Sequence, residues 1–186
     1  MKSKLMGIAA CLTGCLVLLS GCSGSGAASS GGRMSLNLMR KDSHLKIWLD
    51  GQEGKQSTFK KAATGYSRFN IKEQVSDAPK LKFEIEDPDK FGRITMVTVS
   101  IFQKFEADYS HQAEFTIVAK DTNNPEAQMK PGMEYDLGNP GTDFKVLDLT
   151  GNEVTGIKLL PGMEYQLQLI VRADKSETGQ VFFKTK

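Results

Sequence analysis

The stretch Leu160-Pro161-Gly162-Met163-Glu164-Tyr165-Gln166-Leu167-Gln168-Leu169 decides the fold of this 186-residue chain. It opens with a Pro-Gly turn signal and continues as an alternation, with Tyr165, Leu167 and Leu169 on one side and glutamines on the other. Because side chains point alternately to the two faces of a strand, the pattern predicts a strand with one buried and one wet face.

The same alternation recurs along the chain, in 45–49, 81–85 and 115–119, and apolar runs occupy 94–102, 144–149 and 181–184. Turn signals separate these segments, including Asp50-Gly51, Asp87-Pro88-Asp89 and Asn139-Pro140-Gly141. A final hairpin is expected at 176–179, with its turn at Thr178-Gly179. Many short strands with frequent turns predict an all-β, antiparallel β-sandwich.

The segment from Pro161 resembles the corner that leads into the sixth strand of fibronectin type III and related immunoglobulin-like sandwiches. The resemblance implies structural roles for Pro161, Gly162 and Tyr165, whose hydroxyl would bond an upstream backbone group. This resemblance is specific over about the last thirty residues. Before them, from about residue 93, it rests only on the regular spacing of the predicted strands. Trp48, the single tryptophan, lies too far upstream to be the tryptophan that such domains usually contain.

A second copy of this phrase, Lys130-Pro131-Gly132-Met133-Glu134-Tyr135, lies thirty residues earlier. An internal repeat is one interpretation, although the intervening sequence shows no wider self-similarity. The other interpretation is that the same local structure, a turn followed by a strand, occurs twice in one domain, on opposite edges. The sequence leaves both open.

The N-terminus has the layout of a secretory signal: Lys2 and Lys4, then an apolar segment over 5–19. Its end, Leu19-Ser20-Gly21-Cys22, resembles the lipobox of bacterial lipoproteins, which implies that Cys22 is lipidated and becomes the first mature residue. Cys11 and Cys15 also fit a loose lipobox but would leave apolar cores of only about six to ten residues. An uncleaved membrane helix is disfavoured, because 23–33 is rich in glycine and serine.

This interpretation divides the chain into a signal peptide (1–21), a lipidated cysteine with a flexible Gly/Ser tether (22–33) and a β-sandwich domain (34–186). The protein is expected on the cell membrane, held by its acyl chains. Gly24 stands where an aspartate favours inner-membrane retention in enteric lipoproteins, so the resemblance implies the outer membrane if the host has one.

Charge and cysteine content narrow the function classes. All three cysteines lie at or before Cys22, so the domain has no disulfide and no thiolate metal site. Without Lys2 and Lys4 the chain carries 22 basic and 22 acidic residues, a balance that argues against a nucleic-acid partner.

No motif indicates catalysis, a metal or a cofactor, and the chain is expected not to be an enzyme. His44 and His111 are isolated, without a nucleophile motif or metal spacing. Two acidic groups, one around Pro88 and one at Asp121, Asn123 and Glu126, are interpreted as solvated turns rather than calcium sites. Trp48 and Tyr66 are a possible ligand platform, drawn from the aromatic set Trp48, Tyr66, Phe69, Phe102, Phe105 and Tyr109.

The leading functional hypothesis is therefore a membrane-anchored cell-envelope lipoprotein, a non-enzymatic binding or structural module with an envelope protein as partner. The alternative is a carbohydrate- or ligand-binding surface lipoprotein, which would show exposed aromatic residues on one sheet face. A third class, a hydrolase, would need two of Glu84, Glu86 and Asp89 to converge in a cleft.

Overall fold

A computed structural model describes residues 43–57 and 66–186. The predicted signal peptide (1–21), the lipobox residues Leu19, Ser20 and Gly21, the lipidation site Cys22, the tether (22–33) and the first residues of the predicted domain lie outside the described residues.

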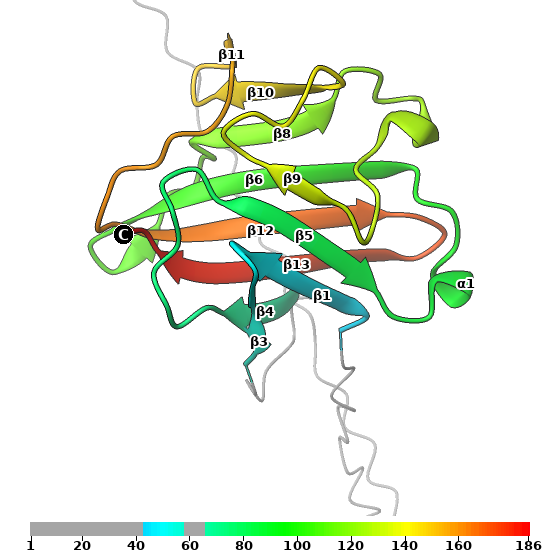
Figure 1. Cartoon of the computed structure of the whole chain (residues 1–186), viewed down its shortest axis with the longest axis horizontal. Coiled ribbons are helices and arrows are strands. Elements are labelled where there is room, and N and C mark those ends of the chain that lie inside the picture. Colours follow the sequence, from blue (N-terminus) through cyan, green and yellow to red (C-terminus); the bar gives the residue numbers. More distant parts are fainter. Residues whose placement is uncertain (1–42, 58–65) are drawn as a thin grey trace, which may run out of the picture. The chain divides into compact units, whose positions relative to one another are not determined.

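Two sheets form the described part of the chain (Figure 1). The four-stranded sheet has the order β2 (Gln52–Glu53), β1 (Leu45–Leu49), β5 (Lys80–Ile85), β9 (Glu134–Asp136). The nine-stranded sheet has the order β11 (Glu153–Val154), β10 (Phe144–Asp148), β8 (Phe115–Ala119), β6 (Met96–Phe105), β12 (Glu164–Arg172), β13 (Ser176–Lys184), β4 (Tyr66–Asn70), β3 (Lys55–Gln56), and β7 (Asp108–Tyr109) also pairs with β6. One short helix, α1 (Pro88–Phe91), and one 3₁₀ turn, η1 (Pro125–Ala127), complete the elements of the described ranges.

The two sheets pack face to face, with β1, β5 and β9 crossing in front of β6, β12 and β13 (Figure 1). All strand pairs are antiparallel except β13 with β4, which is parallel. The predicted all-β antiparallel sandwich is confirmed, and the parallel pair β13–β4 is the exception within the described strands.

Alternation explains why these segments are strands. The inward residues of β12 are Tyr165, Leu167, Leu169 and Val171, and all four are fully buried. They meet Leu45, Ile47 and Leu49 of β1 and Leu81 and Phe83 of β5 in one apolar cluster. Each buried side chain of this size contributes about 1.5–3 kcal/mol, so the layer between the sheets is the main source of stability.

The predicted hairpin turn at Thr178-Gly179 is wrong. The turn between β12 and β13 lies at 173–175, where Ala173 N–H donates to Lys175 O over 3.2 Å, and Gly179 lies within β13 opposite Leu169. A Cβ atom on Gly179 would lie 2.5 Å from Cδ1 of Ile47 in the facing sheet. The glycine is therefore explained by the close approach of two sheets and not by a turn.

The Pro-Gly-Met-Glu-Tyr phrase builds the same corner twice. Leu160 N–H donates to the Tyr165 hydroxyl over 2.9 Å, and Lys130 N–H donates to the Tyr135 hydroxyl over 2.7 Å. The glycine of each turn has a positive φ, 72° at Gly162 and 83° at Gly132. Tyr135 lies in β9 at the edge of the four-stranded sheet. Tyr165 is the second residue of β12, in the middle of the other sheet, so the expectation of two opposite edges is wrong for Tyr165.

Removing either corner hydroxyl should destabilise the domain. In Tyr165→Phe the N–H of Leu160 loses its acceptor in a partly buried position, and we expect the free energy of unfolding to fall by about 1–3 kcal/mol. Tyr135→Phe should act similarly through Lys130. Urea unfolding measures the effect, and Tyr66→Phe at an exposed position is the control, with a change within about 0.5 kcal/mol. Equal stability of Tyr165→Phe and Tyr66→Phe would contradict the role of the corner.

Asp50 joins the β1–β2 turn to the chain that leads into β5. Its Oδ2 accepts from Ser76 N–H over 2.6 Å and its Oδ1 from Lys80 N–H over 2.8 Å. Partial burial raises the pKa of the Asp50 carboxyl, whereas the hydrogen bonds from Ser76 and Lys80 lower it. The hydrogen bonds together outweigh burial, so the pKa of Asp50 lies below its usual value. The ionised carboxylate is thus the form that the fold stabilises.

Acid should remove this contribution. Because the pKa of Asp50 is lower in the folded than in the unfolded state, its stabilisation is present above the unfolded pKa and is lost as pH falls through the folded pKa. The difference in unfolding free energy between the native chain and Asp50→Asn should therefore be largest near neutral pH and shrink toward pH 3. Urea titrations across this range test it, with the exposed Asp108→Asn as control. A difference independent of pH would refute the assignment.

Candidate functional site

The aromatic residues proposed as a platform lie on different sheets. Trp48 points outward from β1 in the four-stranded sheet, half-buried, with Lys82 Nζ 5.1 Å from its ring centre. Tyr66 points outward from β4 in the nine-stranded sheet and is 42% exposed. Since the outer faces of a sandwich point in opposite directions, the structure does not bring Trp48 and Tyr66 together.

The outer face of the four-stranded sheet is covered by ion pairs. Lys46 pairs with Glu86 over 2.7 Å, Lys82 with Glu84 over 2.8 Å, and Lys80 with Glu134 over 3.3 Å. Asp87, in the acidic group around Pro88, pairs with Lys90 over 3.2 Å. Three carboxylates of that group, those of Glu84, Glu86 and Asp87, are thus each bound to a lysine.

The outer face of the nine-stranded sheet has a different composition. The outward residues of its five central strands are Tyr66, Arg68 and Asn70 (β4), Ser176, Thr178, Gln180, Phe182 and Lys184 (β13), Glu164, Gln166, Gln168, Ile170 and Arg172 (β12), Met96, Thr98, Ser100, Phe102 and Lys104 (β6), and Thr116 and Val118 (β8). Glu164 is the one carboxylate among them, and it forms an ion pair with Lys104.

Two neighbouring rows across this face are almost free of charge. One row runs Tyr66, Thr178, Ile170, Thr98, Val118, and the next runs Arg68, Gln180, Gln168, Ser100, Thr116. In the second row the hydroxyls of Ser100 and Thr116 lie 3.4 Å apart. These rows present amides, hydroxyls and apolar groups to solvent.

At one end of the face lies a groove of about 430 Å³, lined by Arg68, Asn70, Tyr109, Glu164, Phe182, Lys184 and their neighbours, which we call the Phe182 groove. Tyr109 comes from β7, and its ring meets the ring of Phe182 edge-to-face, with centroids 5.3 Å apart. The guanidinium carbon of Arg68 lies 5.9 Å from the centre of the Phe182 ring. Three strands distant in sequence therefore supply its aromatic and cationic groups.

Three ionisable groups in or beside the groove, Glu164, Lys104 and Tyr109, have shifted pKa values. The hydrogen bond from Lys104 lowers the pKa of Glu164 and raises that of Lys104, so both stay charged. Burial raises the pKa of Tyr109, which keeps its hydroxyl protonated. None of these shifts moves a group toward neutral pH, so these three residues suit binding better than proton transfer.

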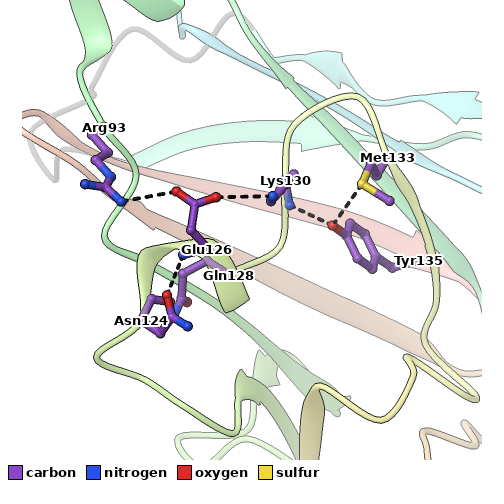
Figure 2. A network of polar contacts seen from close by, with 7 residues as sticks. All are labelled: Arg93, Asn124, Glu126, Gln128, Lys130, Met133 and Tyr135. Carbon is purple, nitrogen blue, oxygen red and sulfur yellow. Dashed lines mark hydrogen bonds and ion pairs between the residues drawn. The ribbon is translucent and has the colours of Figure 1, made fainter.

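A second polar cluster lies in the connection from β8 to β9 (Figure 2). Glu126 accepts from Lys130 over 3.4 Å and from Arg93 over 3.1 Å, and these bonds lower its pKa. The buried Gln128 accepts from Val97 N–H over 3.0 Å and donates to Asn124 O over 3.1 Å. The cluster ties the connection to the start of β6, and it gives Glu126 two cationic partners.

Within the described ranges, no group of three or more His, Cys, Asp or Glu side chains is placed to hold a metal ion. In the same ranges, no helix has the length and apolar character needed to cross a membrane.

Sequence reasoning considered Tyr109 only as one of six aromatic residues and did not identify Arg68 or Phe182. The sequence offered one signal for Phe182. In a strand with Val181 and Phe183 on its buried side, an apolar residue between them must point outward, which breaks the alternation of the apolar run 181–184. Which strand would lie beside β13 could not be read from that run.

The fold defines the class of the protein as a β-sandwich. Comparison with known proteins finds no match to the chain among family models, curated proteins or solved structures.

Proposed function

We propose that the protein is a membrane-anchored lipoprotein of the cell envelope whose immunoglobulin-like sandwich is a non-enzymatic binding module. The anchor rests on the resemblance of Leu19-Ser20-Gly21-Cys22 to a lipobox. The immunoglobulin-like assignment is supported by the Tyr165 corner before β12 and by the antiparallel pairing of β12 with the last strand, β13.

The observation that carries the binding function is the difference between the two outer faces. The four-stranded sheet pairs its charges with one another, whereas the nine-stranded sheet exposes amides, hydroxyls and aromatic rings, with one carboxylate among the outward residues of its five central strands. This face is poor in carboxylates and carries aromatic rings and arginine, and recognition surfaces are likewise depleted in glutamate and aspartate and enriched in aromatic residues and arginine. We therefore assign binding to the outer face of the nine-stranded sheet.

The edges of the sheets are less suited to a partner. The end strands of the described sheets are β2, β3 and β11, each of two residues, and β9, of three. The outward residues of β9, Glu134 and Asp136, are acidic. Short, charged edges disfavour pairing with a strand of another protein, so we propose binding through the face rather than strand addition.

The Phe182 groove favours the second candidate, a carbohydrate- or ligand-binding lipoprotein, as a more specific form of the same function. Its combination of aromatic, amide and cationic groups is what a small polar ligand needs for contact and orientation.

Replacing Cys22 tests the anchor. In Cys22→Ala the sulfur that would carry the lipid is absent, and we expect the chain to move from the membrane pellet to the soluble fraction. Fractionation with immunoblotting measures the distribution, and mass spectrometry of the N-terminal peptide reads acylation directly. Ser23→Ala is the matched control and should remain in the pellet. Continued membrane partitioning of Cys22→Ala, or retention of the first 21 residues, would refute the lipoprotein assignment.

Site-specific photocrosslinking tests the face. With p-benzoylphenylalanine in place of Gln168, at the centre of the outer face, we expect adducts with an envelope component in living cells. The same group in place of Lys82, on the opposite face, should give fewer than a tenth as many. Equal labelling from both positions, or labelling from Lys82 alone, would show that the nine-stranded face is not the binding surface.

A further inference from the structure

The turn before β9 carries an exposed methionine that touches the first corner tyrosine (Figure 2). Met133 is 52% exposed, and the Tyr135 hydroxyl donates to its sulfur, Sδ, over 3.8 Å. The oxygen of the same hydroxyl accepts from Lys130 N–H over 2.7 Å. Met133 is therefore both accessible to solvent and linked to the hydrogen bond that closes the corner.

The other methionines of the described residues are less exposed. Met163 takes the same place in the second copy of the Pro-Gly-Met-Glu-Tyr phrase, but it is partly buried and packs against the core. Met129 is 3% exposed within the core cluster, and Met96 is half-buried at the start of β6. Because oxidation of a methionine requires contact between the sulfur and the oxidant, Met133 is the best placed of these four to react.

Oxidation of Met133 would give the Tyr135 hydroxyl a better acceptor. A thioether sulfur accepts hydrogen bonds weakly, whereas the oxygen of a sulfoxide is negatively polarised and accepts them strongly. Because the hydroxyl oxygen is used as the acceptor of Lys130 N–H, its proton is the part that donates to Met133. Several rotatable bonds let the exposed methionine turn a new oxygen toward this proton. Stronger donation by the hydroxyl also makes its oxygen a better acceptor for Lys130 N–H.

The corner controls how firmly β9 is held. Tyr135 is the one buried residue of this three-residue edge strand, and its ring meets the ring of Phe144 from the nine-stranded sheet at 84°, with centroids 5.6 Å apart. Before the turn, Lys130 forms an ion pair with Glu126 over 3.4 Å. A change in the hydrogen bond between Lys130 and Tyr135 therefore acts on the link between the edge strand and the opposite sheet.

We propose that Met133 is an oxidation site, converted to the sulfoxide by hydrogen peroxide before the other methionines of the described residues, and that its sulfoxide strengthens the Tyr135 corner. The sulfur attacks one peroxide oxygen, so that an S–O bond forms as the O–O bond breaks. The sulfur is oxidised by two electrons, and the peroxide is reduced to water. The Tyr135 hydroxyl then donates to the sulfoxide oxygen. In a core the same oxidation is disruptive, because the added polar group is buried there without a partner.

Peptide mapping by mass spectrometry tests the site. The full chain, purified in detergent, is treated with hydrogen peroxide, and the sulfoxide at each methionine is followed over time. We expect Met133 to react about tenfold faster than the buried Met129, and also faster than Met163, its counterpart in the second copy of the phrase. Oxidation of Met163 or Met129 at the rate of Met133 or above it would overturn the assignment.

Thermal melting tests the effect on the corner, with oxidation stopped once Met133 has reacted and Met129 has not. Compared with Met133→Leu treated in the same way, the native chain should gain about 2–4 °C in melting temperature, the shift that one hydrogen bond gives in a domain of this size. A sulfoxide reductase with a dithiol should reverse the gain, and Tyr135→Phe should not show it. Hydrogen exchange of the Lys130 amide in the native chain gives a local measurement that needs no variant, and we expect it to slow about fivefold on oxidation. Faster exchange, or equal melting shifts in the native chain and Met133→Leu, would overturn the coupling.

Discussion

The structure depends on one contact surface, the apolar layer between the two sheets. Residues 43–186 contain no cysteine, so no disulfide supports them, and the inward side chains of β1, β5, β6 and β12 must hold the sheets together by packing. Gly179 shows how close that packing is, because Ile47 of the facing sheet occupies the space of a side chain there. The outer faces are consequently free to differ, and they do.

Much of this layer could be predicted from the sequence, because burial on one side leaves a period of two. The strands β5 and β8, whose buried residues include Leu81 and Ile117, are recognisable in this way. The strand β4 was missed because it buries a single inward residue, Phe69. The strand β9 buries only Tyr135, and it was expected from the second copy of the Pro-Gly turn phrase and not from alternation. One buried residue gives no periodicity, and such strands are defined by their neighbours.

The candidate site was less predictable for a related reason. A sequence shows which residues share one face of one strand, but not which strands lie side by side. Arg68 and Phe182 meet because β4 pairs with β13, and Tyr109 joins them because the β6–β7 hairpin brings it to the ring of Phe182. The pairing of Trp48 with Tyr66 failed because the two residues belong to different sheets. A net charge near zero likewise concealed the contrast between an ion-paired face and a carboxylate-poor one.

The parallel pairing of β4 with β13 has a consequence for how the chain reaches its final form. Tyr66 to Asn70 align with Thr178 to Phe182, and Val75 bridges to Thr185, 110 residues further along the chain. The segment Tyr66–Asn70 therefore has no place in its sheet until residues 178–182 are available. Contacts so distant along the chain form slowly. A chain that crosses a membrane as a thread would thus stay open until residues 178–185 had emerged, and the Phe182 groove would be completed late.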